Sequence, residues 1–360
     1  MTTHSAVATV GIKAPLAIIQ VPTVTPTGQQ VRVRVEWVAS TPLDLHQNDG
    51  GLLVKHPQVL GDSSAGTVVE IGPDVTRLSV GDKLFGFSWR TQAEKADQEF
   101  YTADEWMFAK LPAGFTLTEA VTLPSSFVTT FHTLKTDLGL ETPWPKPEGY
   151  TPKSAEDAIL VWGGSSSVGQ FAIQILRYYG HKNILVTASR KHHDKLKMLG
   201  AKEAFDYNDP RVVASILRAV GDKGLPLIFD CIGSQHGSIA PIARMAKGGS
   251  RVAILLPVIV RDSSNTVNPE YSMDVSQAAK WAEGVDARGV RTHYYHHDEF
   301  FRLHLQLDMM HAFLKNGIVT PQKQRIVEGA TLLERAQKAM DMLRRKEASM
   351  ERLVWRISDV

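Results

Sequence analysis

The segment Ala158-Ile159-Leu160-Val161-Trp162-Gly163-Gly164-Ser165-Ser166-Ser167-Val168-Gly169 decides the fold of this chain. A short apolar run stops at a glycine pair, three serines follow, and an amphipathic run occupies residues 170–179. This order predicts a strand, a tight turn and a helix. Glycines let backbone approach a ligand closely, and a helix N-terminus presents unpaired N–H groups to a phosphate. The segment therefore predicts a dinucleotide site and a redox function.

The match to the Gly-x-Gly-x-x-Gly fingerprint is partial. Gly164 and Gly169 fit it, but Ser166 stands at the middle position. A glycine-rich turn that binds no ligand would have the same sequence pattern. The rest of the chain therefore has to distinguish a dinucleotide site from such a turn.

Length and composition exclude several classes of protein. The 360 residues are 43% hydrophobic and 22% charged, which is ordinary globular composition, and the length favours two domains. A formal net charge of +2 gives no electrostatic case for nucleic acid or a membrane surface. The single cysteine, Cys231, excludes an intrachain disulfide and a cysteine-rich zinc site. We therefore expect a cytoplasmic protein in a reducing compartment.

The texture of the sequence changes near residue 123. Before it, residues 30–36 alternate strictly and predict a strand, residues 65–72 predict a second strand that ends at Gly72-Pro73-Asp74, and residues 80–86 predict a turn that leads into a third. Short strands with glycine turns predict a small β-rich domain. After it, residues 125–140 read as a helix with Ser125 or Ser126 as N-cap, and residues 141–157 carry four prolines and read as a loop.

Strands and helices then alternate. The predicted strands are 159–162, 184–187, 204–206, 227–230 and 251–256, and the predicted helices are 168–179, 192–199, 210–220 and 236–246. This rhythm predicts an α/β, doubly wound parallel sheet. In the tail, residues 332–345 predict a helix and residues 352–357 a strand.

The order of these parts resembles the medium-chain dehydrogenase/reductase superfamily. Residues 65–75 and 80–86 look like the core of its GroES-like domain, and Gly163–Gly169 resembles the nucleotide loop of its zinc-free reductases. The resemblance implies a GroES-like catalytic domain at 1–124 and 297–360 and a Rossmann cofactor domain at 125–296.

The resemblance also implies independence of zinc. Zinc-containing members carry a cysteine ligand and a Gly-His-Glu segment, whereas this chain has residues 40–44 and Gly61-Asp62-Ser63 in those slots. The histidines His293, His296 and His297 are expected to be surface residues, because adjacent side chains point apart in regular structure. We therefore expect no metal site.

Within the superfamily, the chain is similar to the fungal trans-acting enoyl reductases that serve polyketide synthases. The proline-rich insertion, the ending at residues 351–357 and Pro42-Leu43-Asp44-Leu45-His46 carry this similarity. His46 stands where the group tends to have lysine, so we expect His46 to be a pocket wall.

The phosphate form of the cofactor is favoured at the end of the second Rossmann strand. An NAD enzyme needs a carboxylate there for the ribose 2′-hydroxyl, but this chain has Ser189, Arg190 and Lys191. A guanidinium can hold a 2′-phosphate bidentately, which favours NADPH; the alternative is a solvated basic loop.

The predicted site residues fall into three sets. The cofactor set is Leu43, Asp44, His46, Gly164, Ser165, Ser166, Ser167, Val168, Ser189, Arg190, Lys191, His192, Tyr207, Cys231, Ile254, Leu255, Val354 and Trp355. The substrate set is Ser126, Thr129 and Thr130, and the catalytic set is Thr130, Thr129 and His46. Capping or intrahelical bonding is the alternative role for the three hydroxyls, and an inert buried thiol is the expectation for Cys231.

Three functions compete. With no metal and no evident Ser-Tyr-Lys set, reduction of a conjugated C=C bond is favoured, since the cofactor supplies the hydride and hydrogen-bond donors stabilise the enolate. The first reading is an enoyl-thioester reductase that works with a polyketide synthase carrier domain. The second is a free-standing enone or quinone reductase, and the third is a non-catalytic NADPH-binding protein. A monomer is favoured, because Pro257 follows the fifth strand and disfavours pairing at the sheet edge, and a dimer is the alternative. Arg344, Arg345 and Lys346 form a candidate patch for an acidic carrier, and a solvated helix end is the alternative.

Overall fold

The computed structural model describes residues 2–358, which divide into two compact units. Unit 1 comprises residues 1–128, 263–269 and 295–360, and unit 2 comprises residues 129–262 and 270–294. The predicted domain boundaries at 125 and 297 lie within four residues of this division, and the insertion of 263–269 into unit 1 was not predicted. Residues 1, 359 and 360 of the predicted ranges lie outside the described residues.

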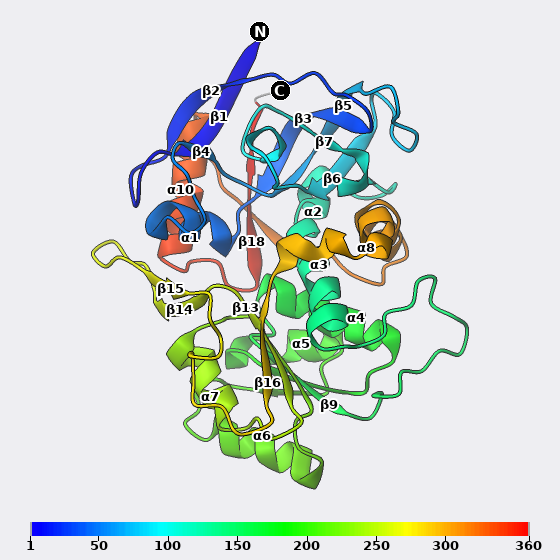
Figure 1. Cartoon of the computed structure of the whole chain (residues 1–360), viewed down its shortest axis with the longest axis vertical. Helices are drawn as coiled ribbons and strands as arrows, with labels where there is room; N and C mark the ends of the chain where they lie inside the picture. Colours follow the sequence, from blue (N-terminus) through cyan, green and yellow to red (C-terminus); the bar gives the residue numbers. More distant parts are fainter. Residues whose placement is uncertain (1, 359–360) are drawn as a thin grey trace. The chain divides into compact units, whose positions relative to one another are not determined.

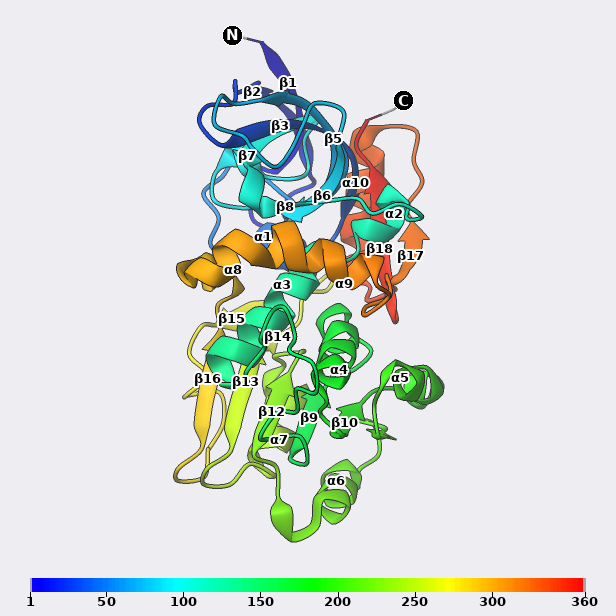
Figure 2. The ribbon, with the colours of Figure 1, turned by 90° about the vertical axis from the view of Figure 1, so that its right-hand side faces the viewer.

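Unit 2 contains a six-stranded sheet in the order β11-β10-β9-β12-β13-β16 (Figure 2). Its strands are β9 (Ala158–Trp162), β10 (Asn183–Thr187), β11 (Glu203–Phe205), β12 (Leu227–Asp230), β13 (Arg251–Leu255) and β16 (Asp286–Val290). Every neighbouring pair is parallel. Strand β9 is buried along its whole length, which explains its continuous apolar sequence. The predicted doubly wound sheet is confirmed.

The helices of unit 2 follow the predicted rhythm with local differences. They are α4 (Ser167–Tyr179), α5 (His193–Leu199), α6 (Val212–Val220) and α7 (Ala240–Ala243). The predicted helix at 192–199 begins with a 3-10 turn at Arg190–His192, and the one at 236–246 begins as a π-helix at Gln235–Ile239. Both differences lie at helix ends, where sequence patterns are least informative.

Unit 1 is built on two sheets. The larger has the order β17-β18-β3-β5-β6-β8, with β7 also paired to β3, and the smaller has the order β2-β1-β4 (Figure 1). The larger sheet contains β3 (Gln30–Ala39), β5 (Ser63–Ile71), β6 (Lys83–Phe87), β7 (Phe100–Asp104), β8 (Phe108–Lys110), β17 (Lys323–Ile326) and β18 (Glu351–Arg356). The smaller contains β1 (Thr3–Thr9), β2 (Ala17–Pro22) and β4 (Gln58–Val59). The valines at 31, 33 and 35 of β3 are buried, as the alternation predicts.

The last helix of unit 1, α10 (Leu332–Arg344), precedes the final strand of the chain. The helices of this unit are α1 (Pro42–Gly50), α2 (Leu117–Ala120), α8 (Glu299–His304), α9 (His311–Lys315) and α10. After α10 the chain returns as β18, which pairs antiparallel with β3. The predicted tail helix and strand are therefore confirmed, and they complete the sheet of the β-rich unit.

Helix α3 (Pro124–His132) begins in unit 1 and ends in unit 2. It starts one residue earlier than predicted and continues as a π-helix at Thr133–Asp137. Neither Ser125 nor Ser126 is its N-cap; instead, the N–H of Ser125 donates to the Ser63 hydroxyl, 3.3 Å away. The cap comes from a distant strand, which a local pattern cannot show. The proline-rich stretch 141–157 contains no helix or strand, as predicted.

Pro257 does not lie next to an edge strand of the parallel sheet, although a monomer was expected on that basis. Pro257 lies between β13 and β14 (Val258–Arg261), which pairs with β15 (Glu270–Ser272), whereas the edge of the parallel sheet is β16, which contains no proline. Pro257 therefore gives no reason to expect a monomer. Within residues 2–358, none of the helices combines the length and the apolar character that crossing a membrane requires.

Candidate functional site

The glycine-rich segment forms a tight turn between β9 and α4. Gly163 has a φ of 84°, a conformation that side chains other than glycine rarely adopt, and its N–H donates to the Thr187 hydroxyl at 3.0 Å. Ser166 caps the helix, because its hydroxyl accepts the N–H of Gly169 at 3.0 Å. The predicted strand, turn and helix are confirmed. Residues 165–168 are half-buried, so the turn and the first helical turn reach the surface of unit 2.

Glycine is required where the helix meets the turn. A methyl group on Gly169 would lie 2.4 Å from the carbonyl oxygen of Gly163 and 2.8 Å from the Cα of Gly164. No atom could be moved cheaply to make room, because both contacts are backbone. Gly169 therefore packs the helix against the turn, and the positive end of the helix points at the space a phosphate would take.

The end of β12 supports the turn. Cys231 is buried, burial raises the pKa of its thiol, and the thiol lies within hydrogen-bonding distance of the Ser166 side chain. The thiol is therefore a wall of the turn and unsuited to act as a nucleophile, as expected.

Asp230 holds the turn that follows β12. Its carboxylate accepts N–H groups of Ile232 (3.0 Å) and Gly233 (3.2 Å) and the Ser238 hydroxyl (2.6 Å). Burial raises the pKa of Asp230 to about 6 although these bonds oppose the shift. Sequence reasoning did not assign Asp230 a role, although its place at a strand end, three residues before Gly233, was a usable signal.

Two predicted cofactor residues meet at the carboxyl edge of the sheet. Ser189 follows β10 and Tyr207 follows β11, and their hydroxyl oxygens lie 2.9 Å apart. Arg190 and Lys191 are exposed beside them, and His192 is half-buried. Burial and the neighbouring Lys191 lower the pKa of His192, so two fixed positive charges stand here and no carboxylate ends β10. This arrangement of hydroxyls and cations suits a dianion such as a ribose 2′-phosphate.

The hydroxyls of α3 are buried. Thr130 has no exposed surface and donates to the carbonyl of Val168 at 3.4 Å, while Thr129 accepts from Thr292 at 3.0 Å. Ser126 is also buried, in unit 1. Within unit 2, Thr130 thus ties the end of α3 to the first turn of α4. The predicted role of Thr129 and Thr130 at the reacting bond stays a prediction.

The cofactor residues predicted in unit 1 are mostly interior. Asp44 is 5% exposed and uses both carboxylate oxygens on backbone, accepting the N–H of Thr41 (2.7 Å) and of Gly61 (3.3 Å). His46 is buried and Leu43 is half-buried. Val354 and Trp355 are core residues of β18 and leave no exposed side-chain surface for a cofactor; the Trp355 indole donates to Ser40.

The remaining predicted cofactor residues lie at the end of β13. Ile254 is fully buried and Leu255 is half-buried. The carbonyl oxygen of Leu255 would lie 2.4 Å from a methyl group on Gly233, so this strand end packs against the turn after β12. The two strand ends are therefore adjacent, as their predicted shared role requires.

The slots that hold zinc ligands in other members have a different content here. Thr41, Asp62 and Ser63 occupy them, and no group of three or more His, Cys, Asp or Glu residues within 2–358 is arranged to hold a metal ion. His296 stacks on Trp106 with ring centroids 6.1 Å apart. The ring centroid of the exposed His297 lies 4.7 Å from that of His296. His296 therefore packs on an aromatic ring of unit 1, whereas His293 is half-buried in unit 2.

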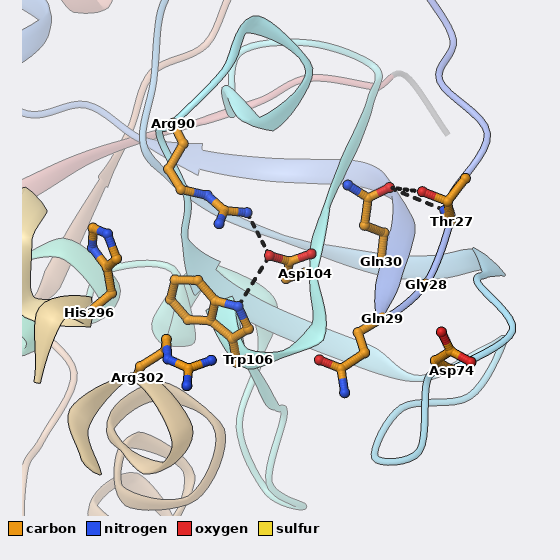
Figure 3. Close-up of a pocket in the computed structure, with 10 residues that line it drawn as sticks. All are labelled: Thr27, Gly28, Gln29, Gln30, Asp74, Arg90, Asp104, Trp106, His296 and Arg302. Atoms are coloured by element: carbon orange, nitrogen blue, oxygen red, sulfur yellow. Dashed lines mark hydrogen bonds and ion pairs between the residues drawn. The ribbon is translucent and has the colours of Figure 1, made fainter. Parts of the chain in front are cut away.

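A shallow hollow of about 500 Å³ opens on unit 1 (Figure 3). Arg90, Asp104 and Trp106 line it, and Asp104 accepts from both neighbours, at 2.7 Å from Arg90 and 3.2 Å from Trp106. None of the predicted site residues lines it. Its charges neutralise one another, so it offers no net charge to an ionic ligand.

Arg344 does not contribute to the basic patch that was predicted for a carrier, whereas Arg345 and Lys346 are exposed. Arg344 is largely buried and makes two hydrogen bonds to Asp49, at 2.7 and 2.8 Å, and one to Asp341 at 2.6 Å. Arg345 pairs with Glu347. The sequence run looked basic because its acidic partner Asp49 lies 295 residues earlier in the chain.

Comparisons with known proteins agree with this geometry. The alcohol dehydrogenase GroES-like domain matches residues 27–133, and the zinc-binding dehydrogenase family matches residues 167–258. The enoyl reductase component lovC of lovastatin nonaketide synthase from Aspergillus terreus is 28% identical, covering 91% of this chain and 89% of that protein. The trans-enoyl reductase tazE from Aspergillus terreus (strain NIH 2624 / FGSC A1156) is 34% identical, covering 59% of this chain and 71% of that protein.

Solved structures share the fold. The CurK enoyl reductase superposes with a TM-score of 0.76 at 16% identity, covering 98% of both chains. The quinone oxidoreductase from Coxiella burnetii gives a TM-score of 0.71 at 18% identity, covering 99% of this chain and all of that one. The GroES-like and Rossmann architecture predicted from sequence is confirmed.

Proposed function

Since the chain belongs to the trans-acting enoyl reductase family of the medium-chain dehydrogenase/reductase superfamily, we propose that it reduces a conjugated C=C bond in an enoyl thioester. Members of this family use a nicotinamide cofactor, and the turn at Gly163–Gly169 supplies the matching phosphate cradle. The observation that carries the proposal is this cradle together with the similarity to proteins named trans-enoyl reductases.

NADPH is the proposed form of the cofactor. The hydroxyls of Ser189 and Tyr207, with the exposed cations Arg190 and Lys191, provide donors for a 2′-phosphate. The carboxylate that would bind a free 2′-hydroxyl has no counterpart at the end of β10. When bound, the cofactor supplies the hydride, a chemistry that side chains lack.

The protein's part in the reaction is orientation and charge stabilisation. In this proposal, the turn holds the pyrophosphate, the pair of Ser189 and Tyr207 holds the ribose 2′-phosphate, and together they fix the reactive end of the cofactor. Helix α3 carries Ser126, Thr129 and Thr130. We assign these hydroxyls either to the carboxamide of the nicotinamide or to the thioester oxygen of the substrate, and negative charge develops on the thioester oxygen during the reaction. The α carbon then receives a proton from water or a weak acid. No metal takes part in the proposal, because neither residues 40–44 nor Gly61-Asp62-Ser63 contain the cysteine or histidine that zinc-containing members have there.

The substrate is proposed to be a polyketide intermediate on an acyl carrier domain. The family similarity supports this assignment. We also propose a cytoplasmic location, and the free thiol of Cys231 agrees with the reducing conditions there. Arg344 pairs internally with Asp49 and is not part of a docking patch for the carrier. Substrate recognition is therefore assigned to the acyl chain and its thioester.

Isotope transfer tests the reaction. Deuteride from labelled NADPH should appear at the β carbon of an enoyl thioester, and the α proton should exchange with solvent. Label at a carbonyl carbon, giving an alcohol, would show a ketoreductase and overturn the proposal. Turnover of carrier-bound but not free enones would favour the carrier-dependent enzyme over a free-standing reductase. Cofactor binding without turnover of any enone would indicate a non-catalytic binding protein.

A further inference from the structure

Three buried carboxyl groups converge in unit 1. Asp44 comes from α1, Asp62 from the turn before β5, and Asp97 from the loop before β7. Their residues are 5%, 6% and 6% exposed. Two cations act on them electrostatically: Lys95, from the loop that carries Asp97, and Arg352, from β18. We call these five residues the carboxylate cluster.

Close contacts to one glycine bring the carboxyl groups together. The carboxylate of Asp44 accepts the N–H of Gly61, at 3.3 Å. A methyl group on Gly61 would lie 2.1 Å from Oδ1 of Asp97, so the Asp97 carboxyl rests directly on this backbone. Asp62 is the next residue in the chain. The three groups therefore share one small volume that little water reaches.

The charges of this cluster do not balance when every group is ionised. Three carboxylates against one ammonium and one guanidinium leave one net negative charge in the interior. Glu94, the other acid near Lys95, is already paired with Arg90 at 2.7 Å and adds no free charge. A buried unbalanced charge is unfavourable, and binding one proton removes it.

We propose that Asp44, Asp62 and Asp97 hold one proton in common at neutral pH, and that this proton keeps the start of helix α3 in its working position. The cluster reaches α3 through two contacts. The Ser63 hydroxyl donates to Asp62 (3.0 Å) and accepts the N–H of Ser125 (3.3 Å). Arg352 donates through Nη2 to the Ser125 hydroxyl (3.0 Å), and its Nε has no hydrogen-bond partner among the described residues.

Arg352 thus donates to the helix while Asp62 and Asp44 act on it electrostatically. When the cluster loses its proton, the added negative charge attracts the guanidinium and weakens its hold on Ser125. Helix α3 carries Ser126, Thr129 and Thr130, so the cluster residues act as positioning residues for the proposed reaction; to this extent the inference rests on the proposed function.

The titration behaviour of the groups agrees with the charge count. Burial, reinforced by Asp44 and Asp62, raises the pKa of Asp97 well above its usual range, and no hydrogen bond to its carboxyl opposes this in the described chain. Burial and the neighbouring Asp62 raise the pKa of Asp44 to about 7, and burial raises that of Asp62. Burial also lowers the pKa of Lys95 and of Arg352. Asp97 is the group that carries the proton most of the time.

The test compares Asp97→Asn with Asp104→Asn. The first variant leaves two carboxylates against two cations and needs no shared proton, whereas the second removes a surface carboxylate outside the cluster. For the wild type, turnover of an enoyl thioester at saturating NADPH should fall about tenfold per pH unit above the pKa of the shared proton. Asp97→Asn should lose this alkaline limb, and Asp104→Asn should keep it. An identical limb in all three proteins would overturn the positioning role.

Infrared spectroscopy of the NADPH complex without substrate tests the proton separately. The wild type should show a protonated carboxyl C=O band near neutral pH that disappears on alkalinisation, and Asp97→Asn should lack it. Absence of the band from the wild type would overturn the shared proton, even if the enzyme turns over. A band with no turnover of any enone would count against the proposed function alone. If Asp97→Asn does not fold, Asp62→Asn serves in its place.

Discussion

The phosphate cradle of unit 2 and the carboxylate cluster of unit 1 are built in opposite ways. The cradle uses backbone N–H groups, hydroxyls and exposed cations within one short segment and two strand ends. The cluster uses three buried acids from separate segments, which two cations and one proposed shared proton neutralise. An anion site therefore depends mainly on local sequence, whereas a buried charge network depends on tertiary contacts between remote segments. Variants in each region test this difference.

The largest effect is expected from Gly169→Ala. The added methyl group would meet backbone at 2.4 Å, so α4 must move away from the turn. We expect loss of NADPH binding by roughly 100-fold or more, and destabilisation of about 1–3 kcal/mol, typical of overpacking. Isothermal titration calorimetry and urea unfolding measure the two quantities.

Gly221→Ala is the matched control. Its φ of 57° also disfavours a side chain, but nothing lies within 4 Å of the added methyl group. It should lose about 1–3 kcal/mol of stability, because its ψ of −145° lies in a region that side chains disfavour, and bind NADPH normally. Equal NADPH affinity in Gly169→Ala and wild type would show that the cradle does not hold the cofactor.

The next effect concerns the pH dependence of stability through Asp230. Its pKa is about 6 in the folded protein against 3.8 ordinarily, so the folded state binds this proton more tightly than the unfolded state. The stability it contributes is fully present below pH 3.8 and is lost as pH rises through about 6, a change of about 3 kcal/mol.

Asp230→Asn should remove this component. The difference in unfolding free energy between wild type and variant, followed by urea denaturation across that pH window, isolates it from the other carboxylates. If the difference in unfolding free energy does not change with pH, Asp230 does not titrate in this window. The proposed difference between a hydrogen-bonded acid in unit 2 and a shared proton in unit 1 would then be wrong.

Cofactor choice should depend on Arg190. We expect NADPH to bind more than tenfold tighter than NADH, since one charged phosphate contact contributes about 1.5–3 kcal/mol. Arg190→Ala should shrink this ratio without weakening NADH. Lys197→Ala, which removes an exposed cation from α5, is the control and should leave the ratio unchanged. Equal wild-type affinities for NADPH and NADH in calorimetric titrations would end the argument for a 2′-phosphate site.

A smaller change is expected from Tyr207→Phe. The variant removes one hydroxyl of the Ser189–Tyr207 pair and keeps the ring. One neutral hydrogen bond contributes about 1 kcal/mol, so NADPH affinity should fall roughly fivefold while NADH affinity stays constant. A parallel loss for both cofactors would place Tyr207 against the adenosine and away from the 2′-phosphate.

The sequence predicted most of the fold because its signals are local. The glycine turn, the parallel strands and the returning tail each depend on residues close together in the chain, and all three are confirmed. Ser189 and Tyr207 were named separately from their strand ends, and the sheet order brings them into contact. The start of α3 was misplaced because its capping hydroxyl belongs to Ser63, 62 residues earlier.

The carboxylate cluster was not predictable in the same way. Asp44 and Asp97 are 53 positions apart in the sequence and belong to no common motif. Only the pairing of β3 with β5 and β7 brings their segments together. Arg344 failed as a surface prediction for the same reason, since its partner Asp49 is remote in the chain. Long-range partners therefore decide which charges are available to a ligand.

The smallest effect is expected from removal of metal. The slots that carry zinc ligands in related enzymes contain Thr41, Asp62 and Ser63, and Asp62 belongs to a cluster whose charge, in our proposal, Lys95, Arg352 and one shared proton balance. A divalent ion would have to displace these cations from a buried site, which makes binding unfavourable. Turnover should therefore change by less than about twofold after exhaustive chelation, and elemental analysis should show zinc well below one ion per chain. A tightly bound zinc whose removal abolishes turnover, and whose return restores it, would show that unit 1 holds a metal where we place a shared proton.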